Sequence, residues 1–198
     1  MPTAEEFLKA HGIEFDYYEH PPVFTVAEAK VYCAHIPGLS TKNLLLTNKK
    51  KTRFVLFILP GDDKADFKKL KEVLGEKFSF ASADILEQKL GVKPGSVSPF
   101  GVINNNEHDV EILIERRVYN ADLVRFHPNR NAASVVLSKE MFRKFLDLIP
   151  NKWEVLDGDV MSNLFGSFKK DGKGKYIPLN KSRKLIVRKL KAEGHRMS

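Results

Sequence analysis

Apolar residues recur along this chain in the two periods that distinguish strands from helices. The run RFVLFILP (residues 53–60) is apolar almost without interruption, and it follows NLLLT and the polar segment NKKKT. This pattern predicts a hairpin whose second strand is buried on both faces and ends at Pro60. Further strands are predicted where β-branched and aromatic residues cluster between charged or Asn-rich turns: FDYYEH, VINN, VEILIE, ASVVLS and WEVLDGDV.

Helices are predicted where apolar residues recur every three or four positions after a residue that can cap a helix. This pattern occurs at residues 3–11, 25–33, 66–74, 82–90 and 138–149. In the last of these helices four residues should face the core: Met141, Phe142, Phe145 and Leu148. The helices are inserted irregularly among the strands. The predicted fold class is therefore α+β, a mixed β-sheet with surrounding helices in a single domain.

Composition describes an ordinary globular chain. The 198 residues are 42% apolar and 29% charged, which is enough for one domain with a substantial core. No stretch reaches the ~20 apolar residues that a membrane span requires. The first residues contain no apolar segment of the secretory type, and the single Cys33 cannot form an internal disulfide. We therefore expect a cytoplasmic protein with no membrane partner.

Positive charge is concentrated near the C-terminus. Residues 166–198 contain 11 Lys and Arg against two acidic residues, whereas residues 1–165 are close to neutral. We therefore divide the chain into a domain, residues 1–165, and a basic, flexible extension, residues 166–198, in which KSRKLIVRKLKAEG can form a short helix. Such a segment can neutralise RNA phosphates, which makes RNA-binding candidates of Lys181, Arg183, Lys184, Arg188 and Lys189. The alternatives are a solubilising tail and a protein-docking helix that presents Leu185, Ile186 and Leu190.

Three short segments combine chemically active residues with strand-like neighbours: TKNLLLT, which contains Lys42, KPGSVSPFG, which contains Gly95, and FHPNRNAAS, which contains His127. A rigid sheet can present a cation, a glycine loop and an imidazole to one ligand in this way. Glycine permits a positive φ and a close approach of backbone to ligand, and an imidazole can donate or accept near neutral pH. Each segment also has a plain alternative: a solvated strand-end lysine, an ordinary turn and a structural histidine.

In this order and spacing, the three segments resemble the YbaK/prolyl-tRNA synthetase-associated domain family. The resemblance extends to HPPVFT, FILPGDDKAD, FASADIL and LSKEMFRKFL, and so covers about three quarters of the chain. Members of that family are free-standing aminoacyl-tRNA deacylases or editing domains of prolyl-tRNA synthetases. The combination of LPG, GVKPGSVSPFG and FHPNRNAA is most similar to the branch that hydrolyses alanine mischarged onto proline tRNA.

The resemblance implies an editing domain over residues 1–165 that acts in trans on mischarged proline tRNA, with prolyl-tRNA synthetase or a multi-synthetase complex as a further partner. It also implies that Lys42 is essential, that Gly95 and His127 belong to the catalytic centre, and that the substrate is contacted by Thr41, Ser96, Val97, Ser98, Pro99 and Asn129. For Asn129 and its neighbour Asn131, the residues themselves favour turns.

An aminoacyl ester is already activated, so its hydrolysis needs an oriented water and a stabilised oxyanion. The remaining histidines lack the HExxH or CxxC spacing of zinc sites, and we expect neither a metal nor a cofactor. Cys33 has no convincing base or orienting group nearby in the sequence and is interpreted as a packing residue. Two other functions stay open: deacylation of cysteine or another small amino acid, and a non-catalytic tRNA-binding subunit of a synthetase complex.

Overall fold

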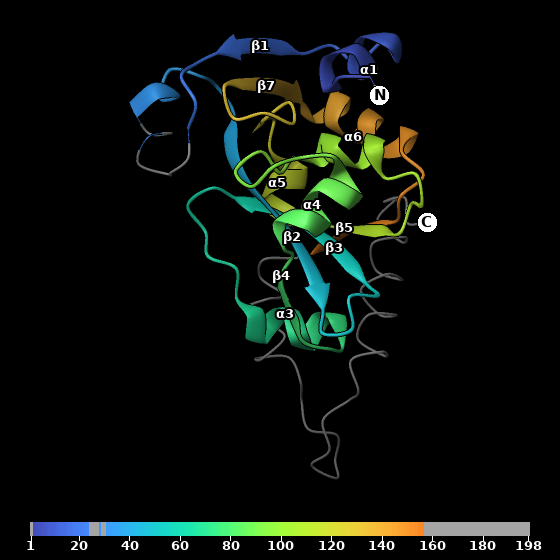
Figure 1. Cartoon of the computed structure of the whole chain (residues 1–198). Coiled ribbons are helices and arrows are strands. Elements are labelled where there is room, and N and C mark those ends of the chain that lie inside the picture. Colours follow the sequence, from blue (N-terminus) through green and yellow to red (C-terminus); the bar gives the residue numbers. More distant parts are fainter. Residues whose placement is uncertain (1, 24–27, 29–30, 157–198) are drawn as a thin grey trace, which may run out of the picture.

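The computed structural model describes residues 2–23, 28 and 31–156 (Figure 1). Its strands form one mixed sheet of eight strands within these residues, in the order β1-β7-β6-β2-β3-β5-β8, with β4 paired to β2. The strands are β1 (Asp16–Glu19), β2 (Leu39–Asn48), β3 (Phe54–Pro60), β4 (Phe78–Phe80), β5 (Val110–Glu115), β6 (Leu123–Phe126), β7 (Ala133–Ser138) and β8 (Trp153–Leu156). The β2–β3 hairpin is antiparallel, whereas β3–β5 and β5–β8 are parallel pairs. The α+β prediction is confirmed.

The described helices are α1 (Ala4–Ala10), α3 (Phe67–Leu74), α4 (Ala83–Leu90), the 3-10 helix η1 (Pro99–Asn104), α5 (Arg116–Asn120) and α6 (Lys139–Leu148). The helices α1, α3 and α6 begin where the sequence predicted, and their capping residues Thr3, Asp66 and Ser138 each accept a hydrogen bond from a first-turn amide. Ser82 precedes α4 as predicted, but its side chain makes no cap hydrogen bond. None of the helices in the described ranges is long and apolar enough to cross a membrane.

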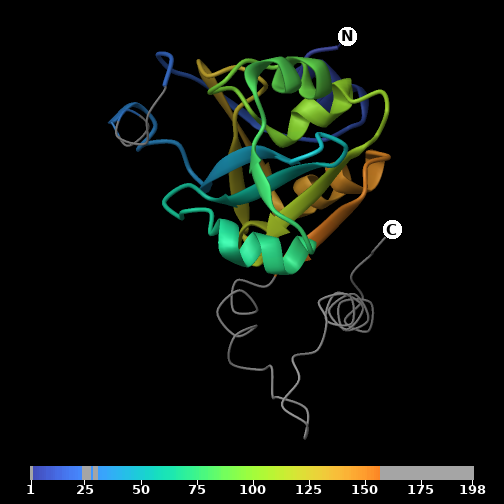
Figure 2. The same ribbon diagram turned by 60° about the horizontal axis from the view of Figure 1, so that its bottom comes forward.

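The sheet is covered on both sides. Side chains alternate along β3, so that Leu56 and Ile58 face one core with α4 and α6, while Val55, Phe57 and Leu59 face a second core with α3. Figure 2 shows α3 and α4 on opposite sides of the sheet. All seven residues of β3 are buried, which confirms the prediction of a strand buried on both faces.

Two predictions of local structure were wrong. The segment VINN is the end of η1 instead of a strand, because Pro99 occupies its first turn and Ser98 Oγ accepts a hydrogen bond from the Phe100 amide. On α6, Leu148 is 42% exposed instead of facing the core. A turn of 100° per residue carries this position away from the buried stripe, and the buried Ile149 takes its place.

Three other predictions fall partly or wholly outside the described residues. The helix expected over residues 25–33 includes undescribed positions, although Glu28, Val31 and Tyr32 are helical. The segment WEVLDGDV forms the outermost strand β8 over its first four residues, and its remainder lies outside the description. The basic extension, with its candidate residues Lys181, Arg183, Lys184, Arg188 and Lys189, lies outside it too.

Candidate active site

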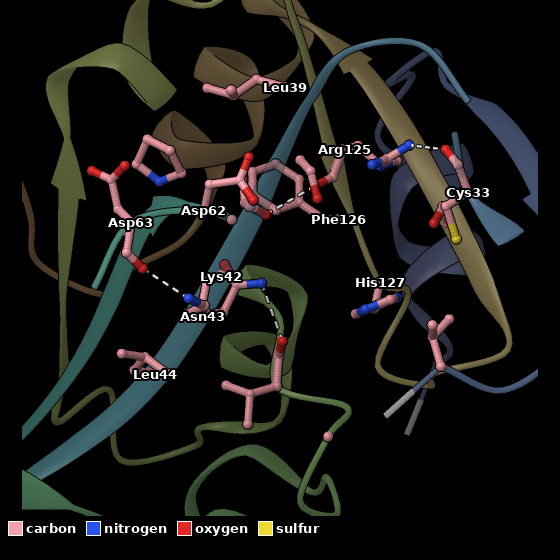
Figure 3. A pocket seen from close by; sticks show the side chains of 18 of the residues that line it. Cys33, Leu39, Lys42, Asn43, Leu44, Asp62, Asp63, Arg125, Phe126 and His127 are labelled. Carbon is pink, nitrogen blue, oxygen red and sulfur yellow. Dashed lines mark hydrogen bonds between the residues drawn. The ribbon is translucent and has the colours of Figure 1, made fainter. Parts of the chain in front are cut away.

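A pocket of about 910 Å³ follows the open edge of β2 (Figure 3). On this edge β2 pairs with β6 through Leu39 and Ser40, and with β4 from Leu46 onward. Residues 41–45 lie between these two partners, and all five line the pocket. The gap between β6 and β4 therefore opens a site within an otherwise continuous sheet.

Lys42 and Asn43 project to opposite sides of β2, as consecutive strand residues must. Lys42 Nζ donates to the main-chain oxygen of Asp63 at 2.8 Å, and Asn43 Nδ2 donates to the main-chain oxygen of Val97 at 3.2 Å. Figure 3 shows Asn43 on the side of His127 and Lys42 on the side of Asp63. Because the pocket follows the edge of the strand, it is lined by both residues.

The turn after β3 fixes the position of Lys42. Two main-chain hydrogen bonds fix the start of this turn: the Gly61 amide donates to Ser40 O at 2.8 Å, and the Asp63 amide donates to Pro60 O at 3.0 Å. The Asp63 carboxylate accepts a hydrogen bond from Arg117, whose Nε donates to Glu115 at 3.1 Å. The hydrogen bond to Asp63 raises the pKa of Arg117 further above its ordinary value. A chain of contacts thus runs from the end of β5 through Arg117 and Asp63 to Lys42.

The glycine loop reaches the pocket through Gly95 and Val97. Gly95 has φ +86°, a left-handed conformation that side chains disfavour. This agrees with the prediction that glycine is needed here. The predicted contacts Ser96, Ser98 and Pro99 are buried and do not line the pocket. Their positions are explained by the loop itself, since the Ser96 amide closes a turn on Lys93 O and Ser98 and Pro99 begin η1.

His127 follows β6 and lines the pocket. Its Nδ1 lies 3.1 Å from Ala133 O, which requires the proton on Nδ1 and leaves the lone pair on Nε2. Burial lowers the pKa of His127 below its usual value of 6.5, with a smaller contribution from the neighbouring His20. His20 is itself fixed by a 3.0 Å contact between its Nε2 and Ser134 Oγ. At neutral pH His127 is therefore an uncharged proton acceptor.

Arg125 holds the wall of the pocket next to His127. Its guanidinium donates to the main-chain oxygens of Cys33 (2.6 Å) and Ile36 (2.9 Å), and its own main-chain oxygen accepts from Thr41 Oγ1 at 2.8 Å. Burial lowers the pKa of Arg125 and raises that of the Cys33 thiol. Cys33 packs with Val23 and Ile36 and stays protonated, as expected for a packing residue.

The structure does not bring Asn129 to the pocket. This residue has φ +59° and is not among the lining residues, and Asn131 donates to Val23 O at 3.5 Å. Both residues belong to the turn between β6 and β7, as their residue type favoured. The substrate contact expected of Asn129 is therefore not supported by its position.

Sequence reasoning missed five polar or charged residues that line the pocket: Asn43, Asp62, Asp63, Arg117 and Arg125. A signal existed for Asn43, which is adjacent to Lys42 and projects to the other side of the strand. Its Oδ1 is buried, and no described residue donates to it. Within the described part of the chain, no group of three or more His, Cys, Asp or Glu is arranged to hold a metal ion.

Comparison with known proteins adds an independent line of evidence. A family model described as an aminoacyl-tRNA editing domain matches residues 20–145. The prolyl-tRNA editing protein ProX of Acetoanaerobium sticklandii is 34% identical over 146 residues, which cover 73% of this chain and 89% of that protein. The prolyl-tRNA synthetase associated domain-containing protein 1 of Danio rerio is 32% identical over 146 residues, 72% of this chain and 79% of that protein.

One solved structure, described provisionally as a trans-editing enzyme for prolyl tRNA synthetase, shares the fold. It superposes with a TM-score of 0.61 over 79% of this chain and 96% of that chain, at 20% identity. The mixed sheet and its flanking helices therefore occur together in that structure as well.

Proposed function

Because this chain belongs to the aminoacyl-tRNA editing domain family and is therefore an aminoacyl-tRNA deacylase, we propose that its substrate is proline tRNA mischarged with alanine. The relative from A. sticklandii, which is named a prolyl-tRNA editing protein, supports the choice of tRNA. The observation that carries the proposal is the pocket on the open edge of β2, where Lys42, Asn43, the Gly95 loop and His127 converge.

The two sides of β2 suit the two parts of the substrate. On one side, Lys42 keeps two of its three donors beyond the bond to Asp63, and this ammonium holds the negatively charged terminal nucleotide. On the other side, Asn43 lines the pocket near His127, and we place the amino acid of the substrate there. The ester then crosses the edge of the strand and lies near His127 and Gly95.

Hydrolysis at this position needs one water and one proton acceptor. His127 Nε2 takes a proton from the water as its oxygen attacks the ester carbonyl carbon. When the intermediate collapses, the bond between the carbonyl carbon and the ribose oxygen breaks and that oxygen takes the proton from His127. Pre-oriented main-chain dipoles of the Gly95 loop stabilise the negative charge on the carbonyl oxygen. The products are free alanine and uncharged tRNA.

Alanine is the chemically sensible target of such a site. The aminoacylation site of a synthetase that is built for proline also admits the smaller alanine. The reason is that a missing methylene group lowers the binding free energy of an amino acid by only ~1–3 kcal/mol. A second, smaller pocket corrects this by accepting alanine and excluding proline. The apolar side chains of Ile36, Leu39 and Leu45 line the pocket and supply walls for a small side chain.

Two further parts of the proposal concern the chain outside the pocket. The basic residues of 166–198 bind the tRNA backbone, since an excess of Lys and Arg is the usual means of phosphate binding. The protein acts in the cytoplasm, alone or with prolyl-tRNA synthetase, where mischarged tRNA is formed. It uses no cofactor, because the ester is already activated.

A deacylation assay with three substrates tests the proposal. Alanyl-, cysteinyl- and prolyl-esters of the same proline tRNA are offered to the full-length chain at equal concentration. We expect fast release of alanine and no release of proline above the spontaneous rate. Faster release of cysteine than of alanine would show that cysteinyl-tRNA is the preferred substrate. Binding of tRNA without release of any amino acid would favour the non-catalytic alternative.

A further inference from the structure

One large aromatic side chain of the pocket is exposed to solvent. Phe80, the last residue of β4, lines the pocket and is 60% exposed. The other exposed large apolar side chains of the described residues, such as Leu148 on α6, lie away from the pocket. An aromatic ring of this size is ordinarily buried. Its exposure beside a functional site points to a ligand that covers it.

The position of Phe80 is fixed by the surrounding structure. Phe80 pairs with Leu46 across the antiparallel β2–β4 ladder, and the Ala81 amide donates to Leu45 O at 2.9 Å. Its ring meets Phe67 of α3 edge to face, with centroids 5.1 Å apart and planes at 76°. This arrangement is preferred by aromatic pairs. The ring is therefore held in place before any ligand arrives.

The register of β2 places Phe80 on the same side of the sheet as Lys42. Residues paired directly across a ladder share a face, so Phe80 lies on the face of Leu46. Lys42 and Leu46 are an even number of residues apart and share that face as well. At ~3.3 Å per residue, the four steps between them span roughly 13 Å. The exposed ring and the ammonium thus lie along one side of the pocket.

We propose that Phe80 is a stacking platform for a nucleobase of the unpaired 3′ end of the tRNA. The inference rests on the proposed function, which places the terminal nucleotide on the Lys42 side of β2. There Lys42 meets the phosphate and Phe80 meets a base, the combination of cation and aromatic ring that proteins use for single-stranded nucleic acid. Every base has a flat π-face, so the platform accepts the 3′ end of any tRNA and contributes affinity without sequence preference.

Binding of a short RNA tests the platform without any need for turnover. The probe is a fluorescently labelled RNA trinucleotide of sequence CCA, titrated against the full-length chain. Stacking of one base changes the dissociation constant by roughly 5- to 150-fold. We therefore expect Phe80→Ala and Phe80→Leu to weaken binding about tenfold, and Phe80→Trp to retain it. Leu148→Ala is the matched control, an exposed apolar side chain outside the pocket, and should bind as the wild type does.

The same variants separate stacking from other contacts. A trinucleotide with the same phosphates and no bases should not distinguish Phe80→Ala from the wild type. The slope of log affinity against log salt should be equal for all variants, because Phe80 carries no charge. Unchanged affinity of Phe80→Ala for CCA overturns the proposal. So does wild-type affinity of Phe80→Leu, which would assign a general apolar contact in place of stacking.

Turnover of alanylated tRNA by the wild-type protein, measured on the same preparation, separates the two proposals. If alanine is released and Phe80→Ala binds CCA normally, the platform is wrong and the proposed function stands. If the wild type releases no amino acid but its binding of CCA depends on the aromatic ring, the proposed function is wrong and the platform stands. Failure of the wild type to bind CCA at all would also overturn the platform.

Discussion

Side-chain alternation along β2 determines how two neighbouring polar residues contribute to the site. Lys42 points toward Asp63 and Asn43 points toward Val97, on the side of His127 (Figure 3). In a strand with partners on both edges, such residues would serve two separate surfaces. The open edge between β6 and β4 lets both line one pocket. One strand can therefore bind two chemically different parts of a substrate.

The protonation of His127 predicts how activity depends on pH. Burial lowers its pKa below 6.5, so the imidazole is neutral and able to accept a proton at pH 7. We expect kcat/KM for deacylation to fall on the acid side with a midpoint below pH 6.5. The variant His127→Gln should be slower at pH 7, and its acid limb should disappear. An acid limb with the same midpoint in His127→Gln would assign the titration to another group.

The same lowered pKa affects stability. Protonation of His127 is easier in the unfolded chain than in the folded one, so acid favours unfolding. The free energy of unfolding should be unaffected by this group above the unfolded pKa of ~6.5, and should decrease as the pH falls through the lower folded pKa. Denaturant titrations of the wild type and His127→Gln between pH 7 and 5 measure the difference. A wild-type protein no more acid-sensitive than the variant would contradict the argument.

At the scale of elements, the contacts between β5, α5 and the turn after β3 position Lys42. Arg117 binds both Glu115 and Asp63, and the main-chain oxygen of Asp63 holds Lys42 Nζ. The Arg117 side chain is 59% exposed, and exposed ion pairs contribute only ~0–1 kcal/mol to stability. A displacement of about 1 Å near the reaction can nevertheless cost up to ~100-fold in rate. We expect Arg117→Ala to lower kcat/KM about tenfold with little change in melting temperature.

Two controls test whether Arg117 acts through Lys42. In a Lys42→Ala background, Arg117→Ala should cause no further loss, because the residue that it positions is gone. Arg130→Ala removes a similar ion pair, with Glu5, outside the pocket and should leave activity unchanged. Additive losses in the double variant would show that Arg117 contributes independently.

The elements that the sequence predicted well are those with strong local signals. The continuous apolar run of β3 and the capped helices α1, α3 and α6 were predicted correctly in kind and place. The strand β4 and the helix α5 have three and five residues, too few to show a period. The segment VINN has strand-like residues, but Pro99 and Ser98 begin a helical turn before it. At this segment the helix start formed by Ser98 and Pro99 outweighs the strand propensity of the residues that follow.

The candidate site divides in the same way. Lys42, Gly95 and His127 were identified from local motifs, and all three line the pocket. Asp63 and Arg117 were not, because their role depends on a contact between residues 54 positions apart. The exclusion of Ser98 from the pocket depends on its burial, which its motif does not reveal. Such roles follow from the packing of the whole sheet.

At the scale of the whole molecule, the charge distribution separates binding from chemistry. All the excess positive charge lies in residues 166–198, whereas the pocket belongs to the nearly neutral domain. Removal of residues 166–198 should weaken tRNA binding at low salt and flatten the slope of log affinity against log salt. It should raise KM and leave kcat nearly unchanged, because uniform binding energy is lost. If the truncated protein binds RNA as tightly as the full-length chain but no longer forms a complex with a partner protein, the extension would instead be a protein-docking helix.

The most direct test of the account is the effect of Lys42→Ala on the deacylation of alanyl-tRNA for proline. In the proposed function Lys42 holds the terminal nucleotide from the open edge of β2, so its loss should lower kcat/KM by about 100-fold. The fold should be retained, since Lys42 is only partly buried. Lys68→Ala, a surface lysine on α3 outside the pocket, is the matched control and should keep full activity. Near-normal hydrolysis by a folded Lys42→Ala protein would contradict the assignment of this pocket as the active site.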